Sequence, residues 1–274
     1  MGVMKRVLVF EAHGDDMEFF AGGTIAKFCA VGHEVTVVCA TDNDKGSFEL
    51  SAEQMRAVRD RELEGAARML GVKRVIPLGY SDGDLAYQAS PEKLRGQFIR
   101  IIREVKPDIM FTWDPFAPYE GHPDHRAVAV AAGEAASFSH FPLYNPEQIR
   151  EGLAPHYVGQ HWFFAKSPRD VNKYVDIDAH IDTKIAALHQ HEAQMVLTIA
   201  DMQHHLRASG LDVPWLAELD PHDYHETIAR RMKAGARTVA EQSGLGCTYA
   251  EAFRRTRFGG IESIAKGQAL PEDV

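Results

Sequence analysis

Two clusters of histidine and aspartate stand directly after apolar runs of the sequence. They are His13-Gly14-Asp15-Asp16, after the run 7–10, and His122-Pro123-Asp124-His125, after the run 109–113. Imidazole nitrogens and carboxylate oxygens are ligands that suit zinc and iron(II). In an open α/β sheet, ligands bind outside the carboxyl ends of the strands, so residues that follow two parallel strands can converge. The two clusters therefore predict a split metal site.

Three protein ligands and an open position for water make a metal site catalytic rather than structural. His13, Asp16 and His125 could supply that set. Asp15 would then be free to take a proton from water whose pKa the metal has lowered toward about 7. His122 remains a candidate general acid or oxyanion donor. Either cluster alone is also compatible with a capping or turn role, but two clusters at two strand ends favour catalysis.

Strand-like and helical segments alternate along the chain, which is the pattern of a parallel sheet built from βαβ units. Strands are expected at 5–10, 34–40, about 74–78, 108–113, 156–165 and 171–177. Helices are expected at about 19–31, from Ser51 to Gly71, and at 90–106, 127–137, 178–206 and about 221–242. The predicted fold is α/β and Rossmann-like, with a mostly parallel sheet flanked by helices and a helix-rich C-terminal extension. We expect one domain over 1–274, with the metal site in 1–140 and the extension in 141–274.

Composition excludes several other classes of protein. The 274 residues are 45% hydrophobic, enough for a substantial core, and carry a net charge of −9 with no basic cluster, which makes nucleic acid an unsuitable partner. No apolar run is long enough to span a membrane and the first residues do not read as a signal peptide, so a cytoplasmic protein is expected. Three scattered cysteines, Cys29, Cys39 and Cys247, do not form a disulfide framework or a cysteine zinc site.

Further segments accompany the two clusters. They are Met17-Glu18 with Gly22-Gly23-Thr24, Arg59-Asp60-Arg61-Glu62-Leu63, Asp82-Gly83, the segment 184–188 with His191 and Gln194, and the segment 250–254. Together with the paired histidine and aspartate motifs, they resemble the LmbE/PIG-L family of zinc-dependent N-deacetylases. The resemblance spans nearly the whole chain.

The resemblance implies a role for each residue of the two clusters. The zinc ligands would be His13, Asp16 and His125, and Asp15 would be the general base. His122 would act as general acid or stabilise the tetrahedral oxyanion, with Asp124 as the partner that orients it.

The resemblance extends to residues outside the clusters and to assembly. Arg59 matches an arginine that helps to hold the substrate or the site, and Asp82 and His191 are assigned with it to substrate binding. The resemblance also implies a homo-oligomer. Two positions depart from the family pattern: Gly14 replaces the usual proline, and Tyr119 lies at an offset from His122 that does not match the family's site tyrosine.

The first functional hypothesis is a zinc- or iron(II)-dependent hydrolase that removes the acetyl group from an N-acetylglucosamine-type sugar. A second hypothesis is an amidase that acts on another sugar or thiol-sugar conjugate. A third is a Rossmann-like protein that binds a small molecule without catalysis, although binding alone would not require this set of imidazoles and carboxylates. Specificity is expected to depend on the segments 43–50, 80–89 and 114–121 and on the C-terminal tail.

Overall fold

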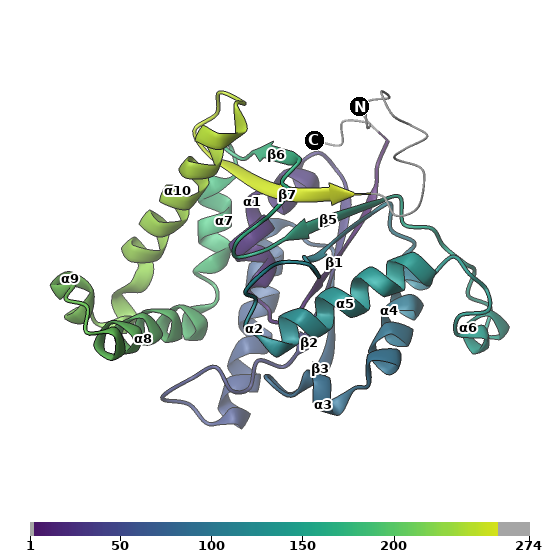
Figure 1. Ribbon diagram of the computed structural model, residues 1–274, viewed down its shortest axis with the longest axis horizontal. Helices are drawn as coiled ribbons and strands as arrows, with labels where there is room; N and C mark the ends of the chain where they lie inside the picture. The colour runs from purple at the N-terminus through teal and green to yellow at the C-terminus, as the bar shows by residue number, and fades with distance from the viewer. Residues whose placement is uncertain (1–2, 257–274) are drawn as a thin grey trace.

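The apolar runs of the first half form the central strands of a mostly parallel sheet (Figure 1). The structure is a computed structural model and describes residues 3–256. The strands within them are β1 (Arg6–Glu11), β2 (Glu34–Thr41), β3 (Arg74–Tyr80), β4 (Ile109–Trp113), β5 (Gln160–Phe164), β6 (Lys173–Asp176) and β7 (Ala250–Thr256). Their order across the sheet is β3-β2-β1-β4-β5-β7-β6. Strands β1 to β5 run parallel, whereas β7 pairs antiparallel with β5 and β6. The predicted α/β class is confirmed.

Helices cover both faces of this sheet. They are α1 (Asp16–Ala30), α2 (Ala52–Leu70), α3 (Leu85–Gln88), α4 (Pro91–Val105), α5 (Pro123–Phe138), α6 (Pro146–Arg150), α7 (Ile181–Leu188), α8 (Glu192–Ser209), α9 (Pro214–Ala217), the 3₁₀ helix η1 (Pro221–Asp223) and α10 (Tyr224–Ser243). Because side chains alternate along a strand, β1 sends Val7 and Val9 into the core under α1, α2 and α7. Leu8 and Phe10 point the other way, into the core under α4 and α5.

The candidate catalytic residues lie at or near the N-termini of two helices. Helix α1 begins at Asp16 and α5 at Pro123, whereas the sequence predicted starts near 19 and 127. The difference arises because the polar residues after β1 and β4 themselves form the first helical turns, where apolar periodicity gives no signal. His122 is the N-cap of α5, and its side chain accepts a hydrogen bond from the Asp124 backbone N–H.

Two features of the second half differ from the prediction. The single helix expected over 178–206 is two helices, α7 and α8, because the chain turns at 189–191 and buries His191 against α2. Strand β7 was not predicted, since charged residues interrupt its apolar pattern. One of these, Glu251, is buried and accepts hydrogen bonds from Lys184 Nζ and from the Gly23 and Thr24 backbone N–H groups. The extension therefore completes the sheet as well as adding helices.

One apolar core links the two halves of the chain. Val7 and Phe111 from the first half pack in the same cluster as Ile181 and Phe253 from the second.

No helix within residues 3–256 is both long and apolar enough to cross a membrane. The end of the predicted extension, 257–274, lies outside the described residues.

Candidate active site

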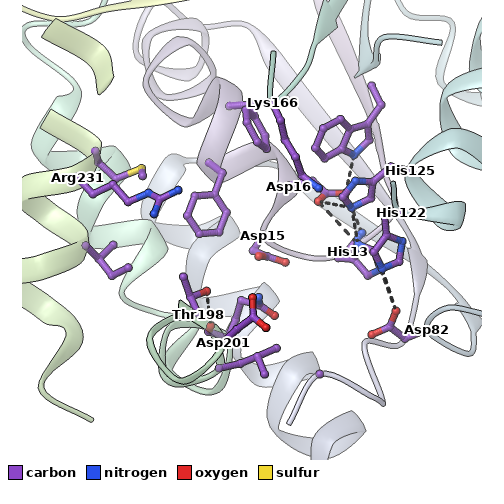
Figure 2. Close-up of a pocket in the computed structure, with 18 residues that line it drawn as sticks. His13, Asp15, Asp16, Asp82, His122, His125, Lys166, Thr198, Asp201 and Arg231 are labelled. Atoms are coloured by element: carbon purple, nitrogen blue, oxygen red, sulfur yellow. Dashed lines mark hydrogen bonds and ion pairs between the residues drawn. The ribbon is translucent and has the colours of Figure 1, made fainter. Parts of the chain in front are cut away.

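Neighbouring strands bring the two polar clusters together. Strands β1 and β4 are paired in parallel, with Val7 opposite Ile109, so their carboxyl ends lie at the same edge of the sheet. His13 follows β1, and His122 and His125 follow β4. Figure 2 shows the three imidazoles grouped with Asp16 and Asp82 at one end of a cavity. The convergence predicted from the sequence is therefore present.

Three ligand-type atoms meet at this point. His13 Nδ1 lies 3.0 Å from His125 Nε2, and Asp16 Oδ1 lies 3.4 Å from His125 Nε2 and 3.8 Å from His13 Nδ1. Tetrahedral ligands about 2.0–2.1 Å from a metal are separated from one another by about 3.3 Å. The spacing of these atoms fits one metal ion.

The Asp16 carboxylate is fixed by its other oxygen. Asp16 Oδ2 accepts hydrogen bonds from the backbone N–H groups of Ala12 and His13 and from Trp113 Nε1, at 2.8–3.0 Å. This leaves Oδ1 turned toward the imidazoles. Burial alone would raise the pKa of Asp16, but His125 and His13 hold it well below its ordinary value. Asp16 is therefore an anion in this site.

His125 has supports that the sequence did not reveal. The Trp113 ring stacks on its imidazole with 4.0 Å between centroids and 13° between planes. At the edge of the ring, Glu120 Oε1 lies 3.2 Å from His125 Nδ1 and also accepts from the His122 backbone N–H and Lys166 Nζ. A carboxylate beside Nδ1 favours the tautomer that leaves Nε2 free for a metal. Glu120 gave no sequence signal beyond its closeness to His122, because its role depends on how the loop after β4 turns.

Asp15 belongs to a different network from Asp16. Arg59 NH2 donates to Asp15 Oδ1 at 3.1 Å, while Arg59 NH1 donates to Glu62 Oε2 at 2.8 Å and lies 3.3 Å from His191 Nδ1. Arg59 and His191 are buried behind Asp15 and do not line the cavity. Burial and the positive charge of Arg59 lower the pKa of His191 to about 3. The neutral His191 and the cationic Arg59 together form a fixed support for Asp15.

Asp124 and Asp82 connect the loop after β3 to the imidazoles. Asp124 accepts from the backbone N–H groups of Gly83 and Leu85, which places Asp82 beside His13. Asp82 Oδ1 lies 3.1 Å from His13 Nε2. Burial would lower the pKa of His13, but Asp124, Asp16 and Asp82 hold it well above its ordinary value. These carboxylates therefore make the site favourable for positive charge.

His122 is less buried than the other two imidazoles. Its Nδ1 accepts from the Asp124 backbone N–H at 3.3 Å, which places the ring proton on Nε2 in the neutral form. Burial and the neighbouring His13 and His125 lower the pKa of His122 to about 4. His122 is therefore a neutral donor at neutral pH. It also groups with His13 and His125 closely enough to be an alternative third metal ligand.

The cavity has a volume of about 600 Å³. Six of the predicted site residues line it, namely His13, Asp15, Asp16, Asp82, His122 and His125. Asp124, Arg59 and His191 lie behind that surface. Tyr119 is 94% exposed and is not part of the lining. The rest of the wall includes residues of α8 and α10, from the second half of the chain.

Comparisons with known proteins identify the family of this site. A family model described as PIG-L, GlcNAc-PI de-N-acetylase, matches residues 8–136. The chain is 32% identical over 229 residues to a diacetylchitobiose deacetylase of Thermococcus kodakarensis, with 82% of each chain covered. The chain belongs to the PIG-L family. The resemblance found in the sequence is thereby confirmed.

Other members of the PIG-L family extend the likeness. A 1D-myo-inositol 2-acetamido-2-deoxy-alpha-D-glucopyranoside deacetylase of Mycobacteroides abscessus is 28% identical over 273 residues, covering 78% of this chain and 97% of that protein. The structure of N,N'-diacetylchitobiose deacetylase from Pyrococcus horikoshii matches with a TM-score of 0.76 and 32% identity, covering 94% of this chain and 85% of that chain. These relatives are deacetylases of N-acetylglucosamine-type sugars.

Proposed function

We propose that this PIG-L-family protein is a metal-dependent hydrolase that removes the acetyl group from the nitrogen of an N-acetylglucosamine-type sugar. The observation that carries the proposal is the meeting of two imidazole nitrogens and one carboxylate oxygen at 3.0–3.8 Å beside the separate carboxylate of Asp15. Water attacks the acetyl carbonyl carbon, the bond from that carbon to nitrogen breaks, and acetate and an amino sugar leave.

The metal would be held by His13 Nδ1, Asp16 Oδ1 and His125 Nε2. Their nitrogen and oxygen donors suit zinc, with iron(II) as the alternative. A divalent cation bound there would polarise the acetyl oxygen and lower the pKa of water to about 7. His122 is the less suitable third ligand. Its Nδ1 already accepts a hydrogen bond from the Asp124 backbone N–H, and its Nε2 lies closer to Asp82 than to either oxygen of Asp16.

Asp15 acts as the general base. It lines the cavity, and Arg59 holds one of its oxygens, which leaves the other free to take a proton from the attacking water. Arg59 and His191, which the sequence assigned to substrate binding, support the reaction through Asp15, since both are buried behind it. Asp82 faces the cavity and is the candidate for accepting a hydrogen bond from a sugar hydroxyl.

His122 donates a hydrogen bond from Nε2 to the oxyanion, and the departing amine takes the proton that Asp15 accepted from water. Asp124 positions it through the backbone N–H contact at Nδ1. The homo-oligomer and the cytoplasmic location expected from the sequence stay predictions.

The experiment that tests the proposed function measures both products. Purified protein is incubated with N-acetylglucosamine and its glycosides, and acetate and free amine are quantified, with Asp15→Asn protein as the control for a contaminating activity. The proposal expects equal amounts of acetate and amine from the parent protein and at least 100-fold less from the variant. Absence of both products with every N-acetylated sugar, at full metal occupancy, would overturn it.

A further inference from the structure

Glu18 is a buried acidic residue that the proposed mechanism does not use. It accompanies the histidine and aspartate motifs in the sequence, and the structure places it as the third residue of α1. Its side chain is fully buried and does not line the cavity, so it is not placed to contact a substrate. Burying a carboxyl group costs free energy unless neighbouring groups bind its oxygens. The side chains around Glu18 therefore indicate what it does.

A buried donor without a partner lies beside this buried acceptor. Neither side-chain oxygen of Glu18 has a hydrogen bond to any atom within residues 3–256. His191 Nε2 is likewise without a hydrogen bond in that part of the chain, and it lies 3.8 Å from Glu18 Oε1. An N–H···O hydrogen bond is about 2.9 Å long, so a shift of about 1 Å brings the two atoms together.

The other nitrogen of His191 determines where the ring proton lies. His191 Nδ1 is 3.3 Å from Arg59 NH1, and a guanidinium can only donate hydrogen bonds. Because His191 is neutral, Nδ1 accepts from Arg59 and the single ring proton is on Nε2. That nitrogen is the one beside Glu18 Oε1.

The contact between Glu18 and His191 leads to the general base. Arg59 NH1 lies beside His191, and Arg59 NH2 donates to Asp15 Oδ1. The path from Glu18 to Asp15 therefore leaves α1, crosses the turn between α7 and α8, passes through α2 and returns to the start of α1. Helices α1, α2 and α7 are in contact with one another, so the path lies within a packed part of the protein.

Arg59 has another anchor, but that anchor does not orient His191. Arg59 NH1 also donates to Glu62 Oε2 at 2.8 Å, and Glu62 Oε1 accepts from the Ala193 backbone N–H. These contacts hold the guanidinium without deciding which nitrogen of His191 carries the proton. If Nδ1 carried it, an N–H group would face the N–H groups of Arg59 and push the guanidinium away. An acceptor at Nε2 favours the tautomer that Arg59 requires.

We propose that Glu18 is a positioning residue, which accepts a hydrogen bond from His191 Nε2 and thereby keeps Arg59 in place against the general base Asp15. Glu18 itself contacts neither water nor sugar in the reaction. This inference rests on the proposed deacetylase function. It predicts that Glu18 affects kcat through Asp15 and leaves substrate and metal affinity unchanged.

Steady-state kinetics of Glu18→Met and Glu18→Gln test the proposal. Methionine has a similar length but no oxygen to accept the hydrogen bond, whereas glutamine keeps one. We expect Glu18→Met to lower kcat about 10-fold, with KM and metal content within about 2-fold of the parent, because the base is present but misplaced. Glu18→Gln should keep most of the parent kcat. Parent-like kcat in Glu18→Met, or loss of its metal, would overturn the proposal.

A double variant distinguishes positioning of the base from general damage to the fold. In protein that already carries Asp15→Asn, Glu18→Met should lower kcat further by less than about 2-fold, since both changes act on the same step. A further loss of about 10-fold there would show that Glu18 acts on the fold instead.

Glu11→Met is the matched control for the double variant. Glu11 is as buried as Glu18, but it accepts from the Met17 backbone N–H and has no hydrogen bond or ion pair with His191 within the described residues. Any loss of kcat that Glu11→Met causes should therefore be the same with and without Asp15→Asn. Equal non-additivity for the Glu11 and Glu18 variants would contradict a specific path through His191.

The tautomer of His191 is measured without any substrate. Nitrogen NMR of the imidazole rings in the full-length, metal-loaded protein reports which nitrogen carries the proton, and His191→Gln protein assigns the signals. We expect the proton on Nε2 in the parent and a mixture of tautomers in Glu18→Met. A proton on Nδ1 in the parent would overturn the proposal, whether or not Glu18→Met folds. Inactivity of the parent on every N-acetylated sugar would instead contradict the deacetylase function itself.

Discussion

Asp15 and Asp16 are adjacent in the chain, but their surroundings suit them to different roles. Asp16 has one oxygen held by three N–H donors and the other beside two imidazoles, as a metal ligand requires. Asp15 is held by Arg59 and faces the cavity, as a base requires. The sequence predicted these side chains and their nearness to the second cluster. It could not predict that Glu120 contacts His125 or that Trp113 stacks on it, because such contacts depend on the path of the loops rather than on residue spacing.

Separate roles for the two aspartates lead to different losses on substitution. Asp15→Asn should keep the metal and lower kcat by about 100-fold or more, since only the proton acceptor is removed. Asp16→Ala should lose the metal, because it removes one of three ligands. Metal content after gel filtration, measured beside kcat, distinguishes the two variants. Equal metal loss in both would contradict the assignment.

Glu120 should act through His125 rather than on substrate. Glu120→Ala removes the carboxylate beside His125 Nδ1 and should weaken metal binding about 10- to 100-fold, the range for such supporting partners. Competition with a chromophoric chelator measures this affinity without reference to activity. Glu134→Ala, a surface carboxylate paired with Arg95, is the control. Parent-like affinity in Glu120→Ala would rule out the supporting role.

At the scale of elements, each predicted site segment joins the end of a strand to the start of a helix. Apolar runs and caps identified the strands of the first half and the helices α2 and α4, because these follow simple periodicity. Strand β7 and the turn between α7 and α8 were missed, because tertiary partners decide both. Glu251 in β7 is tolerated only through its contacts with Lys184 and α1.

The packing of α1 depends on Gly23. A Cβ atom there would lie 2.8–2.9 Å from Ile177, so the helix or the chain beside β6 would have to shift. Gly23→Ala should lower the free energy of unfolding by about 1–3 kcal/mol. Gly235→Ala, within α10 and with open space around it, should instead raise it by up to about 1 kcal/mol. Urea unfolding of both proteins tests the contrast, and a loss of equal size in each would refute it.

At the scale of the whole molecule, the two halves of the chain share one core and one cavity. The imidazoles and carboxylates of the candidate site come from the first half, while α8 and α10 of the second supply part of the cavity wall. The sequence indicated that specificity would lie in loops and in the tail. It could not show which helix faces meet the cavity, because the apolar residues of α8 do not gather on one face of the helix.

Buried histidine makes stability depend on pH. Burial lowers the pKa of His161 in β5 to about 4, below the value of about 6.5 in the unfolded chain. The unfolded state therefore binds more protons between these values, and stability falls as pH drops through this window. From pH 7 to pH 5 the parent should lose about 2 kcal/mol more than His161→Gln, which does not titrate. Denaturant unfolding at both pH values is the measurement, and equal losses would show that His161 does not contribute.

The central claim, a metal-dependent deacetylase centre built from His13, Asp16 and His125, is tested most directly by metal titration. Protein stripped by a chelator is mixed with increasing zinc, or with iron(II) in a parallel series, and acetate release from an N-acetylated glycoside is followed. We predict no activity without metal and a rise that levels at one equivalent per chain. Full activity in the stripped protein, or no recovery with either metal while the protein remains folded, would contradict the account.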